Sequence, residues 1–194
     1  MTDAPVPAAV REDDRWELVE ETEEDLGKTG PVRVTARRTL YGDRRLRERV
    51  REATGVDRQW RSLFASTLVT APPLSRGITD LVVRTVAAPV AGSRFAADLR
   101  DRGFEGVGSV ETSRPTVGDG TRARATRFSA RIPVEGADPV DAEALLAVWG
   151  RDDHMLAAGG TYPVGRLRTA AGEAPFDPPA EYRRDLLELI RTVG

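Results

Sequence analysis

The apolar run Leu145–Trp149 constrains the fold of this chain more than any other segment. All five residues are apolar and adjacent, whereas a strand with one face in water alternates apolar and polar residues. An unbroken run is instead typical of a strand that is covered on both faces. We therefore predict that this segment forms a central strand, with other elements packed on both faces of its sheet.

Turn signals between the candidate strands predict that this sheet is antiparallel. Gly118-Asp119-Gly120 contains the Asp-Gly pair that favours a tight turn, and Gly27–Pro31 has similar turn chemistry. The segments beside these turns alternate, or are rich in β-branched and aromatic residues, as strands are. The candidate strands are residues 15–21, 32–41, 60–70, 105–113, 121–134, 144–149 and 154–161.

Three helices are expected before the run. Asp43 can cap the first, which Gly55 can end in the left-handed conformation. The second is expected over 79–88, ended by Pro89, and the third over 93–102, with a C-terminal cap at Gly103 and Phe104. Apolar residues that recur at helical spacing support the first and third of these helices.

A fourth helix, over residues 179–193, is expected to lie across the sheet. Asp177 is its expected cap, and Pro178 suits its first turn. We expect Trp149 to pack beneath this helix through Leu186 or Ile190. The apolar stripe of the helix is formed by Tyr182, Leu186, Leu189, Ile190 and Val193.

These elements predict one α+β domain over residues 15–194, with an antiparallel sheet of about six to seven strands. A chain of 194 residues is of single-domain size. Residues 1–14, with two prolines and clustered charge, are expected to form a flexible arm. In the first hairpin, we expect inward-facing side chains at Trp16, Leu18, Val32, Val34 and Leu40.

Composition excludes several classes of site and partner. The chain has no cysteine, so disulfides, thiolate metal sites, iron–sulfur clusters and a cysteine nucleophile are excluded. The 29 basic and 31 acidic residues give a net charge of -2, which argues against general binding of nucleic acid. No apolar stretch approaches the roughly 20 residues of a membrane span, and no signal peptide is evident. We expect a cytoplasmic protein that does not enter a membrane.

The only histidine, His154, follows two carboxylates, Asp152 and Asp153. This group could serve acid–base catalysis or hold a metal ion, as in a small hydrolase or a metal-dependent enzyme. Three adjacent residues in a tight turn, however, point in different directions. The alternative is a hairpin tip at Asp152-Asp153, with His154 opening the next strand.

Four arginines follow one candidate strand: Arg122, Arg124, Arg127 and Arg131. Together with arginines of a second strand, they could form a basic face for an anionic ligand. The acidic residues of the first strand offer the alternative of cross-strand ion pairs. The glycine-rich segments 103–108 and 159–160 lack the strand–loop–helix order of a phosphate loop. No cofactor is therefore expected.

Two segments carry a resemblance to known families. Phe95–Phe104, and Leu146–Trp149 followed by Met155–Pro163, resemble an uncharacterised family of haloarchaeal α+β proteins. That resemblance implies a fold and transfers no functional residue. The order of helix, Gly-Phe, strand meander and terminal helix is more loosely similar to PsbP/Mog1-like proteins, which implies an accessory or partner-binding role.

We therefore expect a non-catalytic binding or accessory protein, with a protein partner whose identity the sequence does not supply. The alternative is a hydrolase or metal-dependent enzyme that uses His154.

Overall fold

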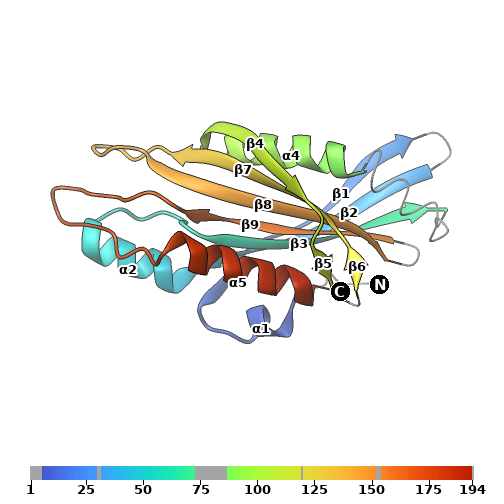
Figure 1. Ribbon diagram of the computed structural model, residues 1–194, viewed down its shortest axis with the longest axis horizontal. Coiled ribbons are helices and arrows are strands. Elements are labelled where there is room, and N and C mark those ends of the chain that lie inside the picture. Colours follow the sequence, from blue (N-terminus) through green and yellow to red (C-terminus); the bar gives the residue numbers. More distant parts are fainter. Residues whose placement is uncertain (1–5, 30–31, 73–86, 119, 152–153, 194) are drawn as a thin grey trace.

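Figure 1 shows one sheet running through the molecule, with helices on both of its faces. The computed structural model describes residues 6–29, 32–72, 87–118, 120–151 and 154–193. The strands of the main sheet are β1 (Trp16–Thr29), β2 (Val32–Asp43), β3 (Ser62–Ala71), β4 (Glu105–Ser113), β7 (Arg124–Ile132), β8 (Val140–Arg151) and β9 (His154–Pro163).

The sheet is antiparallel throughout and consists of two meanders. Its strand order is β1-β2-β3-β9-β8-β7-β4, and each pair of neighbours is antiparallel. The first meander, β1-β2-β3, meets the second, β4-β7-β8-β9, where β3 pairs with β9. A small ribbon of β5 (Thr116–Val117) and β6 (Thr121–Arg122) lies between β4 and β7 in the chain. The antiparallel sheet expected from the turn signals is confirmed.

Four described helices cover the two faces of the sheet. The helices α1 (Ala8–Arg11), α2 (Arg44–Thr54) and α5 (Pro179–Thr192) lie on one face, and α4 (Ala88–Asp101) lies on the other (Figure 1). Buried side chains form a separate core on each side. The expected α+β class, with the C-terminal helix packed on the sheet, is thus confirmed.

The apolar run that predicted a central strand lies within β8, one strand from the middle of the sheet. Leu145, Ala147 and Trp149 belong to the core beneath α5, whereas Leu146 and Val148 belong to the core beneath α4. Both faces of β8 are therefore covered. This is why the segment carries no polar residue at alternate positions.

The cap of α2 forms as expected. The Asp43 carboxylate accepts a hydrogen bond of 2.9 Å from the Leu46 backbone N–H, which satisfies one of the free donors in the first turn. At the other end, Gly55 adopts the left-handed conformation with a φ of 76°. The chain thereby leaves α2 sharply and turns toward β3.

A flexible arm was expected over residues 1–14, but residues 6–14 pack on the domain. Val6 and Val10 are buried in the α5-side core, and α1 holds Val10 at 0% exposure. Two valines four residues apart give this segment an apolar face, so it packs on the domain. Residues 1–5 lie outside the described residues.

Three smaller expectations are corrected. Pro89 does not end a helix, because it lies in the first turn of α4, where its missing N–H would have no intrahelical partner. Leu18, on the edge strand β1, is 55% exposed and does not face a core. Asp177 does not cap α5: the N-cap is Pro178, and the Asp177 carboxylate pairs with Arg49.

The remaining expectations can be checked only where they fall on residues that the structure describes. Trp16 and Leu40 are buried as expected, whereas the side chains of Val32 and Val34 are not described. The expected helix over 79–88 lies mostly outside the described residues. Among the helices that the structure does describe, none is long and apolar enough to pass through a membrane.

Candidate ligand pocket

A pocket of about 670 Å³ lies between α4 and the sheet. On its face of the sheet, α4 packs mainly over β4, β7 and β8. Over β2, β3 and β9 the helix therefore leaves space. The pocket volume falls within the range of roughly 300–1,000 Å³ that is usual for sites binding small molecules.

The pocket lining is mainly apolar. Leu40 of β2 and Phe64 of β3 line it from the sheet, and Phe95 and Leu99 line it from α4. A polar spot interrupts this apolar surface where Ser62 Oγ and Thr161 Oγ1 form a hydrogen bond of 2.8 Å across β3 and β9. Because these two hydroxyls bond to each other, this spot presents only part of its hydrogen-bonding capacity to a ligand.

Glycine on β9 determines how the Phe64 ring lies on the sheet. A Cβ at Gly159 would come within 2.8 Å of Phe64 Cε1 and 2.1 Å of the Leu145 carbonyl oxygen. Without that Cβ, the Phe64 ring can lie close to β9. It also packs against Phe95 with a ring-centroid distance of 5.3 Å, so the sheet and α4 are joined by aromatic contact at the edge of the pocket.

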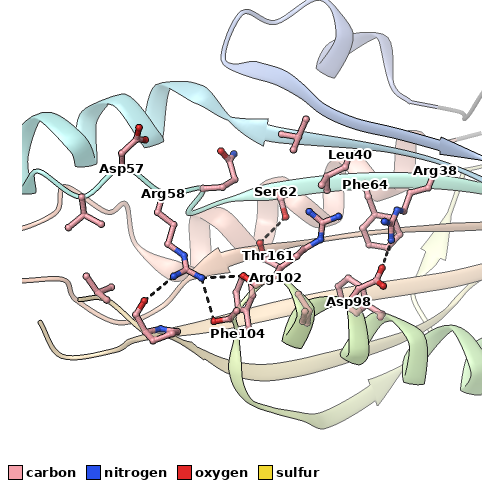
Figure 2. Close-up of a pocket in the computed structure, with 18 of the residues that line it drawn as sticks. Arg38, Leu40, Asp57, Arg58, Ser62, Phe64, Asp98, Arg102, Phe104 and Thr161 are labelled. Carbon is pink, nitrogen blue, oxygen red and sulfur yellow. Dashed lines mark hydrogen bonds and ion pairs between the residues drawn. The ribbon is translucent and has the colours of Figure 1, made fainter. Parts of the chain in front are cut away.

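Ion pairs link α4 to the first two strands. Arg38 of β2 pairs with Asp98 of α4, as Figure 2 shows. Glu20 of β1 pairs with Arg102, directly after α4, at 2.5 Å. Arg94 and Glu24 form a third pair at 3.2 Å. These pairs are partly or largely exposed, so each contributes little to stability. They nevertheless join the two walls of the pocket.

Arg58 closes another part of the pocket. Its guanidinium donates a hydrogen bond of 2.9 Å to the Pro133 carbonyl, and longer ones to the carbonyls of Arg102 at 3.4 Å and Gly103 at 3.5 Å. Figure 2 shows this side chain reaching across the pocket toward Phe104. The guanidinium carbon lies 6.0 Å from the centre of the Phe104 ring, within reach of a cation–π contact.

Local structure fixes both Arg58 and Phe104. Arg58 stands in the short connection from α2 to β3, between the left-handed Gly55 and Trp60, which is 0% exposed. Phe104 follows Gly103, whose φ is 82°, and its backbone N–H donates to the Leu99 carbonyl. This bond is typical of a helix end with a left-handed glycine, and it confirms the expected cap of this helix.

With this geometry established, comparisons with known proteins identify the family. A model described as a domain of unknown function, DUF6517, matches residues 3–194. The chain belongs to this family. The uncharacterised family expected from the sequence is thereby confirmed as one of unknown function, whereas its haloarchaeal source and the likeness to PsbP/Mog1-like proteins stay predictions.

The other comparisons add little to the DUF6517 assignment. No curated protein matches the chain. Among solved structures, it is similar to the crystal structure of LpqN, described as involved in cell envelope biogenesis of Mycobacterium tuberculosis. The identity is 11% and the TM-score 0.30, over 98% of this chain and 78% of the other.

The histidine considered from the sequence lies away from the pocket. His154 begins β9, whereas Thr161, which lines the pocket, stands near the other end of the same strand. Seven residues of extended chain separate positions by about 23 Å. Asp152 and Asp153 lie outside the described residues. In the part of the chain that the structure describes, no group of three or more acidic or histidine side chains could hold a metal ion.

The four arginines considered as a basic face do not line the pocket. Arg127 pairs with Glu143 at 2.6 Å and with Glu111 at 3.0 Å. Arg122 donates to the Arg114 carbonyl at 3.5 Å. Arg124 belongs to β7 and is half-buried, and Arg131, on the same strand, is exposed. Arg127 thus forms ion pairs across strands, but its partners belong to β4 and β8 and not to the first strand, as the alternative given above expected. Ligand binding by these four arginines stays a prediction.

The glycine-rich segments have structural roles. Gly106 has a φ of 61° at a register shift between Glu105 and Gly108, where β4 bulges against β7. Gly159 and Gly160 are buried within β9. A Cβ at Gly160 would lie 2.0 Å from the Ser62 carbonyl oxygen, so β3 and β9 approach closely there.

Sequence reasoning did not find the pocket residues. Arg58 and Phe104 are 46 positions apart in the sequence, and only the packing of α4 on the sheet brings them together. One local signal was available. Arg58 falls between a helix end and a buried tryptophan, in a loop whose side chains have fixed positions, and such loops often carry binding residues.

Proposed function

We propose that this protein is a non-catalytic binding protein, and that the pocket between α4 and the sheet holds a small, mainly apolar molecule. The observation that carries this proposal is the lining of the pocket: apolar and aromatic side chains from β2, β3 and α4 surround a space of about 670 Å³. Pockets of this size and lining are the usual sites of small-molecule binding.

Two of the three carboxylates that line the pocket form ion pairs, which favours binding over catalysis. The Asp98 carboxylate is paired with Arg38, and the Asp57 carboxylate is paired with Arg47 at 2.5 Å. Asp57 is also held in its charged form, because the hydrogen bond from Arg47 lowers its pKa. Catalytic acids and bases instead have pKa values tuned toward the working pH.

Binding of a neutral fluorescent probe tests this proposal. N-phenyl-1-naphthylamine is apolar and gains fluorescence when it leaves water, so titration with it measures the affinity of an apolar site. We expect the parent protein to bind it. A phenylalanine side chain at position 62 would project into the pocket, so Ser62→Phe should bind the probe at least about tenfold more weakly, a difference of 1.4 kcal/mol.

Ser129→Phe is the matched control, since Ser129 is exposed on β7 and does not line the pocket. This variant should bind the probe like the parent. A parent protein that does not bind the probe, or a Ser62→Phe variant that is folded and binds it equally well, would contradict the proposed function. The cytoplasmic location and the protein partner stay predictions from the sequence.

A further inference from the structure

Only some of the charged side chains around the pocket have an oppositely charged partner. Six charged side chains line it: Arg38, Asp57, Arg58, Asp98, Arg102 and Glu135. Four of them form ion pairs, either with each other or with neighbours on β1 and α2. Among the described residues, Arg58 and Glu135 have no oppositely charged side chain within ion-pair distance. Glu135 is exposed to water, whereas Arg58 is half-buried.

The surroundings of Arg58 make an unpaired charge costly. Burial lowers the pKa of its guanidinium, which means that the charged form loses hydration without gaining a carboxylate. Carbonyl groups at the C-terminal end of α4 offset part of this cost. Two of those contacts, to Arg102 and Gly103, are as long as 3.4 and 3.5 Å, so they are weak hydrogen bonds.

The Arg58 guanidinium also has donors to spare. It has five N–H groups, and three hydrogen bonds to carbonyl oxygens are formed. A carboxylate matches the planar fork of arginine, and it would accept two parallel hydrogen bonds from Nε and Nη2 once it replaced the long contacts of Nη2 to Arg102 and Gly103. The apolar lining of the pocket begins beside this group, at Phe104 and Val134.

We propose that the ligand of this pocket is a fatty acid, whose carboxylate binds Arg58 and whose apolar chain lies along the Phe64 side of the pocket. This inference depends on the proposed function and adds the chemical class of the ligand. Arg58 would supply the binding energy for the charged end, and the apolar lining would supply that for the chain.

Decanoate and 1-decanol are the probes, because they share the chain and differ in the charged group. Each is used, below the concentration at which it aggregates, to displace N-phenyl-1-naphthylamine. We expect decanoate to bind the parent at least about tenfold more tightly than decanol, as a charged hydrogen bond would give. Decanol is the more apolar of the two, so a site without a cation would bind decanol more tightly than decanoate.

Arg58→Gln should abolish this preference while keeping decanol affinity. Arg100→Gln is the matched control: Arg100 also donates to a backbone carbonyl, that of Val107 at 3.0 Å, but does not line the pocket. It should keep the preference. If Arg58 only supported the end of α4, Arg58→Gln would weaken both probes equally, and the ratio of their affinities would not change.

The possible failures are distinguishable. If decanol and the fluorophore bind but the parent shows no preference for decanoate, a fatty acid is not the ligand. The proposed binding of an apolar molecule in the pocket then still holds, whether or not Arg58→Gln folds. If none of the three probes binds, the proposed function itself is wrong. If the preference survives in Arg58→Gln, the carboxylate does not bind Arg58.

Discussion

The guanidinium of Arg61 lies 3.4 Å from the carboxylate of Asp43, and the two residues are only 4% and 3% exposed. The Arg61 guanidinium also lies 5.1 Å from the ring centres of Trp16 and Tyr182. It thus joins the start of α2 to β1 and α5. Because Asp43 also caps α2, one carboxylate serves both a helix end and a buried cation.

Asp43→Asn tests the importance of this pair. Asparagine keeps an oxygen that can cap α2, but it removes the charge that faces Arg61. Loss of one partner from a buried pair costs about 3–5 kcal/mol, and Asp185, which also lies 3.4 Å from Arg61, keeps the expected cost near the lower figure. Urea denaturation measures it.

Glu23→Gln is the control for that experiment. Glu23 pairs with Arg37 across β1 and β2 at 2.9 Å, but its side chain is 57% exposed. Its loss should lower the free energy of unfolding by less than about 1 kcal/mol. Equal destabilisation by the two substitutions would show that burial gives the Arg61–Asp43 pair no special role.

Trp149→Ala should be among the most destabilising substitutions in the chain. Trp149 is 2% exposed and belongs to the same core as Leu186 and Ile190 of α5. Its burial on the α5 side was expected from the sequence, and its direct contact with Leu186 or Ile190 stays a prediction. Removal of a buried tryptophan side chain costs about 3–5 kcal/mol. Val110→Ala, at a position that is 53% exposed on β4, should change stability by no more than about 0.5 kcal/mol. Thermal denaturation compares the two.

Gly159→Ala tests the close approach of β8 and β9. The added Cβ would lie 2.1 Å from the Leu145 carbonyl oxygen, which is backbone and cannot turn away. We expect a loss of about 1–3 kcal/mol in the free energy of unfolding. Gly108→Ala, also in a strand but with open space around its Cβ, is the control and should unfold close to the parent.

Stability should fall at alkaline pH through two buried tyrosines. Burial raises the pKa of Tyr162 and of Tyr182 to about 12, from the ordinary value of 10.0. Between these pH values the unfolded chain binds fewer protons than the folded chain, so the free energy of unfolding decreases as pH rises. The contribution is fully present below pH 10.0 and lost as pH passes about 12.

Urea denaturation at a series of pH values measures this decrease. Replacement of both Tyr162 and Tyr182 by phenylalanine should make it smaller, because phenylalanine does not titrate. A native protein whose tyrosines all ionise near pH 10.0, as followed by tyrosinate absorbance, would contradict the expected role of burial.

Local signals in the sequence predicted much of the fold. The cap at Asp43, the left-handed glycines at positions 55 and 103, and the covered strand at Leu145–Trp149 depend on neighbouring residues or on one strand's own pattern. The exposure of Leu18 was not predictable in this way. Alternation along a strand predicts which side chains share one face of the sheet, but not whether a helix covers that face.

The pocket could not be predicted, because its residues come from segments far apart in the chain. Phe64, Phe95 and Phe104 each follow a local pattern of strand, helix or cap. Their meeting depends on where α4 lies on the sheet. The sequence instead drew attention to His154, a rare residue beside two carboxylates, and chemical reactivity in a sequence does not by itself indicate a cavity.

A crystal structure of the protein with decanoate tests the central claim most directly. We expect the carboxylate within hydrogen-bond distance of the Arg58 guanidinium, and the chain in the pocket between α4 and the sheet, against Leu40 and Phe64. Decanoate bound on another surface, or an empty pocket at a saturating concentration with Arg58 still on the Pro133 carbonyl, would contradict the account.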